Sequence, residues 1–161
     1  MQKKMSTKFM VQGAMIAAIY VILTKIFEPI SFGMNGAIQC RVSELLTILP
    51  VFTPAAVPGV FIGCLIGNIL GGGAIIDIIF GSLTTLLAAF LTYKLRKNWY
   101  IAVIPPIVLN GLIVGGYLPA VYGMNIPVWL SMVYVALGQV ISCGICGLLL
   151  AKVLDKTPIF K

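Results

Sequence analysis

The amino-acid sequence predicts an all-α polytopic membrane protein with six transmembrane helices. Of its 161 residues, 60% are apolar, and the mean hydropathy is +1.10. Since a transmembrane helix needs about 20 apolar residues, this length accommodates five or six crossings joined by short loops. The apolar runs lack the alternation of apolar and polar residues that marks the strands of a transmembrane barrel. We therefore expect a single integral membrane domain over residues 1–161.

Basic residues gather at the ends of the apolar runs, and the formal net charge is +7. The groups are Lys3, Lys4 and Lys8, then Lys94, Arg96 and Lys97, and finally Lys152, Lys156 and Lys161. The positive-inside rule places such groups on the cytoplasmic side of a membrane. We expect both termini in the cytoplasm, and we interpret the charge as a determinant of orientation rather than as a nucleic-acid-binding surface.

The cysteines and the absence of histidine argue against a metal site or a cofactor. The cysteines are Cys40, Cys64, Cys143 and Cys146. Three of them lie within apolar runs, where a free cysteine packs as a small hydrophobic residue. The last two form a CxxC pair, but a zinc site needs a second pair or histidines. We expect neither a metal nor a cofactor, and the lack of histidine also removes the commonest general base.

The first helix is expected over residues 9–27. This apolar run is too long for a secretory signal peptide, and it lacks a small-residue cleavage site. Ala14 and Ala18 lie four residues apart on one face, and small residues at that spacing allow a second helix to approach closely. The helix that packs against this face belongs either to the same bundle or to a partner protein, and these residues by themselves favour the bundle.

The second helix, expected over residues 41–52, begins with the charges that are most unusual for an apolar segment. Arg41 and Glu44 are three residues apart, so a helix presents both on one face. A charged side chain inside hydrocarbon costs roughly 2.5–3.5 kcal/mol even on lenient insertion scales. The two residues therefore either have a paired or ligand-facing role or lie at the headgroup rim, and we favour the first interpretation. The helix ends near Pro50 because proline breaks helices.

The third helix, expected over residues 55–70, carries glycines at a strict four-residue spacing. These glycines are Gly59, Gly63, Gly67 and Gly71. Such a ladder provides a smooth groove for a neighbouring helix, and we interpret it as structural. Asn68 lies near the outer end of this helix.

The fourth helix is expected over residues 78–95, after a glycine-rich turn. Asp77 lies at or near its start, where a carboxylate complements the positive end of the helix dipole. This residue can cap the helix or bind a ligand, and the two roles are compatible.

The fifth and sixth helices are expected over residues 100–117 and 128–153. Asn110 lies more than halfway across the fifth helix. Trp129 lies toward the outer end of the sixth helix, a position typical of the interfacial aromatic belt. Gln139 lies near the middle of the membrane, where a carboxamide needs a hydrogen-bonding partner.

This topology places the unusual polar residues in the outer half of the membrane or near its midplane. They are Glu28, Asn35, Gln39, Arg41, Glu44, Asn68, Asp77, Asn110 and Gln139. Polar groups that converge on one leaflet indicate a pocket open to the outside rather than a continuous pore. Carboxylates and carboxamides suit a flat heterocycle such as guanine, whose ring N–H and amino group can both donate to one carboxylate. The aromatic side chains available to cover the ring are Phe32, Tyr117, Tyr122 and Trp129.

Several sequence blocks together carry a family resemblance. They are RVSELLTILP, TPAAVPGVFIGCLIGN, a glycine turn leading into DIIFGSLTTLLAAFLTY, then PPIVLNGLIVG and GQVISC. In this order, and over nearly the whole chain, they resemble the queuosine-precursor transporter family (QueT). The resemblance implies a substrate-binding S component of an energy-coupling factor transporter, with its site on the extracellular side. It also implies a 7-deazaguanine base as ligand, and a transmembrane coupling protein and two ATPase subunits as partners.

The resemblance also assigns roles to individual residues. It places Arg41, Glu44, Asp77 and Asn110 toward the ligand. With the residues singled out by their positions in the helices, the candidate substrate-binding residues are Arg41, Glu44, Asn68, Asp77, Asn110, Trp129 and Gln139. S components carry a small-xxx-small pattern that meets the coupling protein, and Ala14 and Ala18 match it, which favours docking over packing. Gln139 stands where the family pattern often has an acidic residue, which predicts weaker binding of a cationic group.

We therefore expect a transport subunit without catalytic residues, and the sequence contains no GxxxxGK[ST] loop for nucleotide hydrolysis. An S component for another vitamin or nucleobase is the alternative within the same class. A small integral membrane enzyme would use Glu44 and Asp77 as an acid–base pair, but no nucleophile-plus-base motif supports it. A purely structural subunit would explain the glycine ladder and leave the polar residues unexplained.

Overall fold

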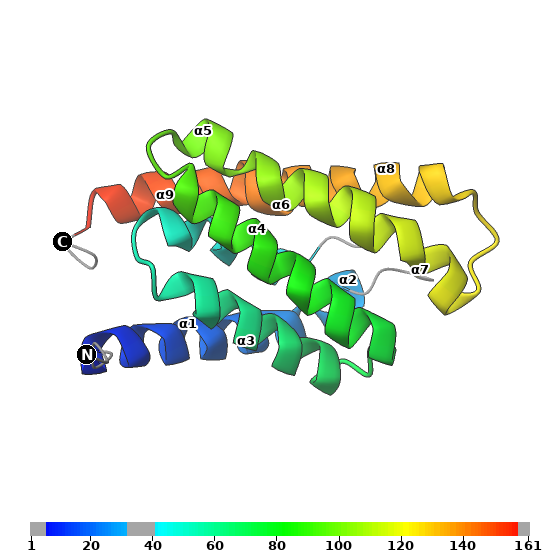
Figure 1. Cartoon of the computed structure of the whole chain (residues 1–161), viewed down its shortest axis with the longest axis horizontal. Coiled ribbons are helices and arrows are strands. Elements are labelled where there is room, and N and C mark those ends of the chain that lie inside the picture. Colours follow the sequence, from blue (N-terminus) through cyan, green and yellow to red (C-terminus); the bar gives the residue numbers. More distant parts are fainter. Residues whose placement is uncertain (1–5, 32–40, 158–161) are drawn as a thin grey trace, which may run out of the picture.

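The computed structural model describes residues 6–31 and 41–157, which form a bundle of helices (Figure 1). The first part comprises α1 (Thr7–Ile26), α2 (Glu28–Ser31), η2 (Val42–Val51) and α3 (Ala56–Leu70). The central part comprises η3 (Asp77–Gly81), α4 (Ser82–Lys94), α5 (Trp99–Ala102), α6 (Ile104–Leu109), η4 (Asn110–Val114) and α7 (Gly115–Tyr122). The last part comprises α8 (Val128–Gln139), η5 (Val140–Cys146) and α9 (Gly147–Asp155).

The predicted fold class is confirmed, because these elements join end to end into six helical segments and the described ranges contain no strand. Three segments are long and apolar enough to cross a membrane: Thr7–Ile26, Trp99–Tyr122 and Val128–Asp155. Large apolar side chains are exposed along the outside of the bundle, among them Met15, Phe80 and Leu149. A surface of this kind suits a lipid environment.

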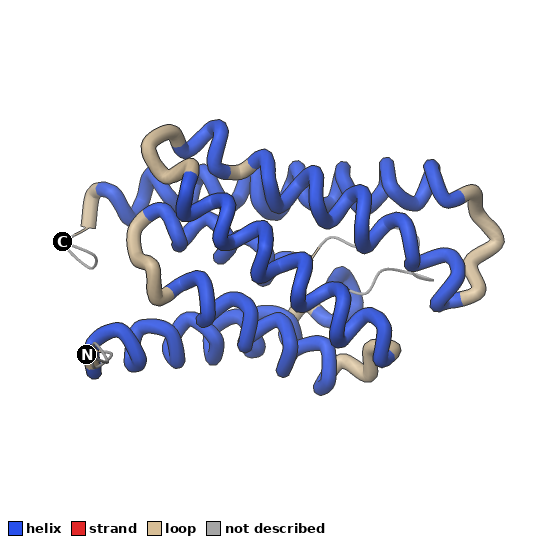
Figure 2. Tube along the Cα trace, in the orientation of Figure 1, coloured by secondary structure: helices blue, strands red, loops and turns tan. Residues whose placement is uncertain are grey.

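The two ends of the bundle differ in charge. Tan loops at both ends of the bundle join successive segments (Figure 2), and α1 begins at the end where α9 finishes. Lys8, Lys94 and Lys152 lie on the turns of α1, α4 and α9 closest to that end, which we call the basic end. The opposite end, where α7 meets α8, is called the distal end.

The glycine ladder of α3 packs against α1, as its spacing predicted. A Cβ atom on Gly63 would lie 2.6 Å from the Tyr20 Cβ, and one on Gly59 would lie 2.9 Å from the Gly13 carbonyl oxygen. The two backbones therefore approach more closely than any larger side chain would permit. Ala17 and Tyr20 belong to this buried face of α1, whereas Ala14 and Ala18 lie on its exposed face.

The second helical segment is a buried 3₁₀ helix rather than an α-helix. η2 contacts α1, α3, α4, α5, α9 and η5, so it occupies the centre of the bundle. A 3₁₀ helix rises about 2.0 Å per residue. Its 10 residues therefore extend about 20 Å, compared with about 15 Å for an α-helix of the same length. This stretched geometry carries Arg41, at its N-terminal cap, into the distal half of the core.

Candidate functional site

A buried ion pair joins the start of η2 to the start of η3. The Arg41 Nη2 atom donates to the Asp77 Oδ2 atom at 3.0 Å, and the side chain of Asp77 is fully buried. The Arg41 Nη1 atom donates to the Asn68 Oδ1 atom at 2.9 Å. The guanidinium thus binds two acceptors from two elements, and both bonds gain strength because the donor is charged.

Tyrosines from α7 complete the surroundings of the Asp77 carboxylate. The Tyr117 hydroxyl donates to Oδ1 at 2.5 Å, and the Tyr122 hydroxyl lies 3.3 Å from Oδ2. A Cβ atom on Gly81 would lie 3.2 Å from the Tyr117 hydroxyl oxygen and 3.1 Å from Oδ1. The glycine at this position therefore leaves room for the bond between Tyr117 and Asp77.

Glu44 forms a second buried carboxylate centre one turn further into η2. Its side chain is 1% exposed, and the Tyr20 hydroxyl donates to its Oε1 atom at 2.5 Å. The Thr85 hydroxyl lies 3.4 Å from the same oxygen. The Oε2 atom is buried without a hydrogen-bond partner among the described residues. Since burying an unsatisfied polar atom is costly, this oxygen is a marked exception in the core.

Two cysteines contribute hydrogen bonds to the same region. The Cys143 thiol lies 2.8 Å from the Gln139 Oε1 atom and 3.3 Å from the Glu44 carbonyl oxygen. The Asn68 and Thr85 side chains lie within 3.6 Å of the Cys64 sulfur. Both cysteines are buried, as packing residues would be, but they also bridge polar groups.

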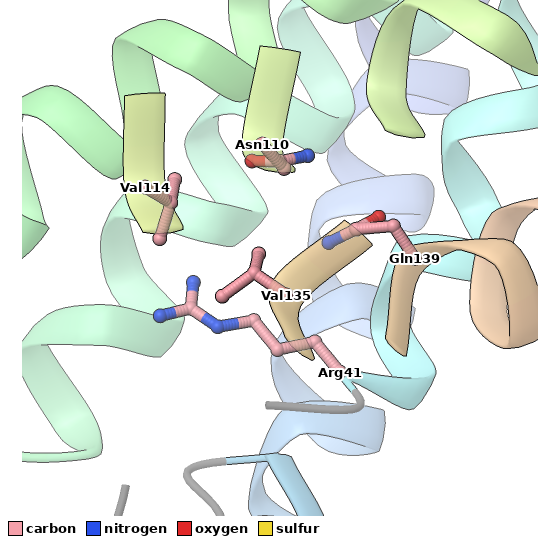
Figure 3. Close-up of a pocket in the computed structure, with 5 residues that line it drawn as sticks. All are labelled: Arg41, Asn110, Val114, Val135 and Gln139. Carbon is pink, nitrogen blue, oxygen red and sulfur yellow. The ribbon is translucent and has the colours of Figure 1, made fainter. Parts of the chain in front are cut away.

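A small cavity of about 10 Å³ separates the ion pair from two carboxamides. Its lining residues are Arg41, Asn110, Val114, Val135 and Gln139 (Figure 3). The Asn110 Nδ2 atom is buried and has no hydrogen-bond partner in the described part of the chain. A cavity of this volume holds about one water molecule.

The π-helical segments of the bundle begin at the polar residues of the site. η3 begins at Asp77, η4 begins at Asn110, and η5 directly follows Gln139. Segments of π-helix are rare and occur frequently at functional sites, because the wider turn redirects a side chain into the interior. These three segments were not predicted from the sequence.

The structure brings most of the predicted site residues together. Arg41, Asn68 and Asp77 are in direct contact, Asn110 and Gln139 line the cavity beside Arg41, and Glu44 follows Arg41 in η2. The residues that the structure adds are Tyr20, Cys64, Thr85 and Cys143. A tyrosine facing the glycine ladder was the available signal for Tyr20, because a hydroxyl buried between helices needs an acceptor.

Other predicted residues lie elsewhere. Trp129 lies in the first turn of α8 and is 65% exposed, so it does not join the cluster. Glu28 is exposed and pairs with Lys25 at 2.8 Å. Phe32, Asn35, Gln39 and Cys40 lie outside the described residues. Within the described ranges, no three His, Cys, Asp or Glu side chains converge on a point where they could hold a metal ion.

Comparison with known proteins relates this chain to a family of transporters. The sequence model of the family described as QueT transporter matches residues 10–156. The chain is similar to the queuosine precursor transporter QueT of Lactococcus lactis subsp. cremoris (strain MG1363), with 41% identity over 102 residues. The aligned region covers 61% of this chain and 59% of that relative, so the match spans less than two thirds of the relative's length. No solved structure matches the chain.

Proposed function

The chain belongs to the QueT transporter family, and from this membership we propose that it captures a queuosine precursor, a 7-deazaguanine base, at the outer face of the membrane. In this proposal it is the substrate-binding S component of an energy-coupling factor importer. A transmembrane coupling protein and two ATPase subunits supply the energy, and the chain itself performs no chemistry. The curated relative's name supports the choice of substrate.

The buried polar cluster around the small cavity is the observation that carries this proposal. An ion pair, a second carboxylate and two carboxamides are expensive to keep inside a membrane bundle. Glu44 and Asn110 each retain a buried polar atom without a hydrogen-bond partner among the described residues. A bound base that accepts from the Asn110 carboxamide and extends a donor beyond the cavity lining to the Glu44 carboxylate would satisfy both atoms. The cluster is thus better explained by a ligand than by stability alone.

The shape and chemistry of the lining also suit a flat ring. Val114 and Val135 offer apolar surface to the faces of a base, while Asn110 and Gln139 offer carboxamides to its edge. Ligand pockets commonly combine mostly apolar walls with a few polar groups that fix orientation. Glu44, Asn68 and Asp77 complete the proposed contacts with the base, and Arg41 lies in the same cluster.

The charge distribution supports an orientation with the cluster toward the outside. Lys8, Lys94 and Lys152 lie at the basic end, which the positive-inside rule assigns to the cytoplasm. The ion pair lies in the distal half, so a base would approach it from the exterior. The termini of the bundle would then face the cytoplasm.

Equilibrium binding to the purified protein tests the capture of a base. The protein in lipid nanodiscs is titrated with 7-aminomethyl-7-deazaguanine, with guanine and adenine as comparisons. Glu44→Gln should weaken binding of the deazaguanine at least about tenfold, because a hydrogen bond to a charged group is lost. Glu28→Gln is the matched control, because this carboxylate is exposed and outside the cluster. Absence of binding to the wild-type protein would overturn the proposed substrate.

The exposed face of α1 is the proposed contact with the coupling protein. Ala14 and Ala18 lie on this face, and α3 covers the opposite face of the same helix. Ala14→Trp and Ala18→Trp should abolish co-purification with the coupling protein and leave base binding intact. Ala120→Trp is the control, because Ala120 is an exposed alanine on α7. Assembly that survives both α1 substitutions would refute this docking face.

A further inference from the structure

The cavity is too small for the proposed ligand, so a base enters only if a side chain leaves. Its volume is about 10 Å³, which holds about one water molecule. Val114 and Val135 are β-branched residues with stiff side chains, and helical backbone fixes both. Arg41 has the longest side chain in the lining, with several rotatable bonds. Its residue lies just before η2 in extended backbone, with φ −76° and ψ 101°.

The guanidinium of Arg41 presents the same donor pattern as the edge of a guanine-type base. Two nitrogens attached to one carbon donate to two oxygens, Asn68 Oδ1 at 2.9 Å and Asp77 Oδ2 at 3.0 Å. In a 2-aminopyrimidin-4-one ring, the ring N–H and the amino group are likewise attached to one carbon. Both groups are planar and donate in parallel, so one pair of acceptors fits either of them.

We propose that the Arg41 guanidinium occupies the subsite formed by Asn68 and Asp77 when no ligand is bound, and that the guanidine-like edge of a base displaces it. Arg41 is thus a stand-in for the ligand. This inference rests on the proposed function, and it specifies which edge of the base the protein recognises by hydrogen bonding. The specificity then follows from the two acceptors. A base without the 2-amino group offers one donor fewer and binds more weakly.

The Asp77 carboxylate keeps other hydrogen-bond donors during this exchange. When the guanidinium withdraws, the Tyr117 hydroxyl at 2.5 Å and the Tyr122 hydroxyl at 3.3 Å still donate to the carboxylate oxygens. The acceptor therefore stays fixed in place and retains part of its stabilisation. Withdrawal of the Arg41 side chain also enlarges the existing cavity by the space that the side chain had occupied. Asn110, with its buried Nδ2 atom, then faces the opposite edge of the ring as a donor.

Opposite effects of two substitutions test the exchange. A resident competitor lowers apparent affinity in proportion to the fraction of sites that it occupies. Arg41→Ala should therefore bind 7-aminomethyl-7-deazaguanine about tenfold more tightly than the wild-type protein, and Asp77→Asn should lose at least about tenfold in affinity. A purely structural ion pair predicts instead that both substitutions weaken binding. Arg96→Ala, at the exposed basic end, is the control and should leave affinity unchanged.

A small cation provides a test that does not depend on the base. Methylguanidinium at millimolar concentration should raise the melting temperature of Arg41→Ala and compete with the base for that variant. It should do neither for the wild-type protein. If Arg41→Ala does not fold, Arg41→Lys is used, because lysine lacks the planar fork and should also bind the base more tightly.

Two results separate this inference from the proposed function. Wild-type binding of the base, with weaker binding by Arg41→Ala or Arg41→Lys, would overturn the stand-in role and keep the function. Failure of every variant to bind a deazaguanine would overturn the function. Binding of methylguanidinium by Arg41→Ala would then still support the subsite, and no binding of either probe would overturn both.

Discussion

The two halves of the bundle use the same helices in opposite ways. In the distal half, the core is built from hydrogen-bonded polar groups around Asp77 and Glu44, some atoms of which lack partners among the described residues. Near the basic end, Ile48 of η2 forms a purely apolar cluster with Ala102 and Ala151. The apolar half gains stability from close packing, whereas the polar half keeps costly groups in place. The difference indicates that the proposed binding groups are confined to the polar half, where only their mutual pairing offsets the cost of burial, whereas the apolar half contributes packing alone, and substitutions can test this division.

The largest expected loss of stability follows removal of the buried charge. Asp77→Asn leaves the Arg41 guanidinium without its carboxylate in the core, and breaking a buried pair in this way costs roughly 3–5 kcal/mol. The melting temperature of the purified protein in detergent should fall sharply. Asp155→Asn is the control, because Asp155 is exposed near the end of α9. Equal melting temperatures for the two variants would show that the polar half contributes no stability through this pair.

The next effect concerns the helix interface that supports both halves. A Cβ atom on Gly63 would lie 2.6 Å from the Tyr20 Cβ, so Gly63→Ala must push α1 away from α3. Overpacking of this kind typically costs about 1–3 kcal/mol. At Gly144, the added atom would meet its nearest neighbour at 3.7 Å, an ordinary contact, so Gly144→Ala serves as the matched control. Thermal unfolding in detergent separates the two, and equal stability would contradict the close approach.

A smaller change should affect binding more than stability. Tyr20→Phe keeps the ring packed against Gly63 and removes only the hydroxyl that donates to Glu44 at 2.5 Å. The free carboxylate then loses its fixed position, and affinity for the base should fall about tenfold. Tyr100→Phe is the control, since Tyr100 is 64% exposed near the basic end. Unchanged affinity in isothermal titration would remove Tyr20 from the site.

Hydropathy alone was sufficient to predict the six helical segments, because each apolar run is bounded by turn residues or basic groups. The proximity of Arg41, Asn68 and Asp77 also followed from the topology, which sends isolated polar residues to one side. The role of these residues in binding a ligand stays a prediction. The 3₁₀ geometry of η2 could not be predicted, because it results from burial among six neighbouring elements rather than from local preference.

The hydroxyl partners were the hardest part of the site to predict. Tyr117 was expected to cover the face of a ring, whereas its hydroxyl binds Asp77 in the structure. A tyrosine near the end of an apolar helix suits either the interface or a buried hydrogen bond, and the sequence does not distinguish the two. The choice depends on Gly81, which leaves space for the hydroxyl although it lies 36 positions before Tyr117 in the chain. Such a contact is visible only after the helices have been packed.

The smallest effect is expected in the apolar half, and it is the sharpest test of the division. Ile48 is 1% exposed and packs against Ala102 and Ala151, so Ile48→Val removes one methylene group from a filled core. The loss should be about 0.5–1.5 kcal/mol of stability, with no change in affinity for the base. Ile141→Val, at a residue that is 50% exposed, is the control for stability. A change in base affinity with Ile48→Val would mean that η2 transmits packing from the apolar half to Glu44, and that the two halves act as one unit.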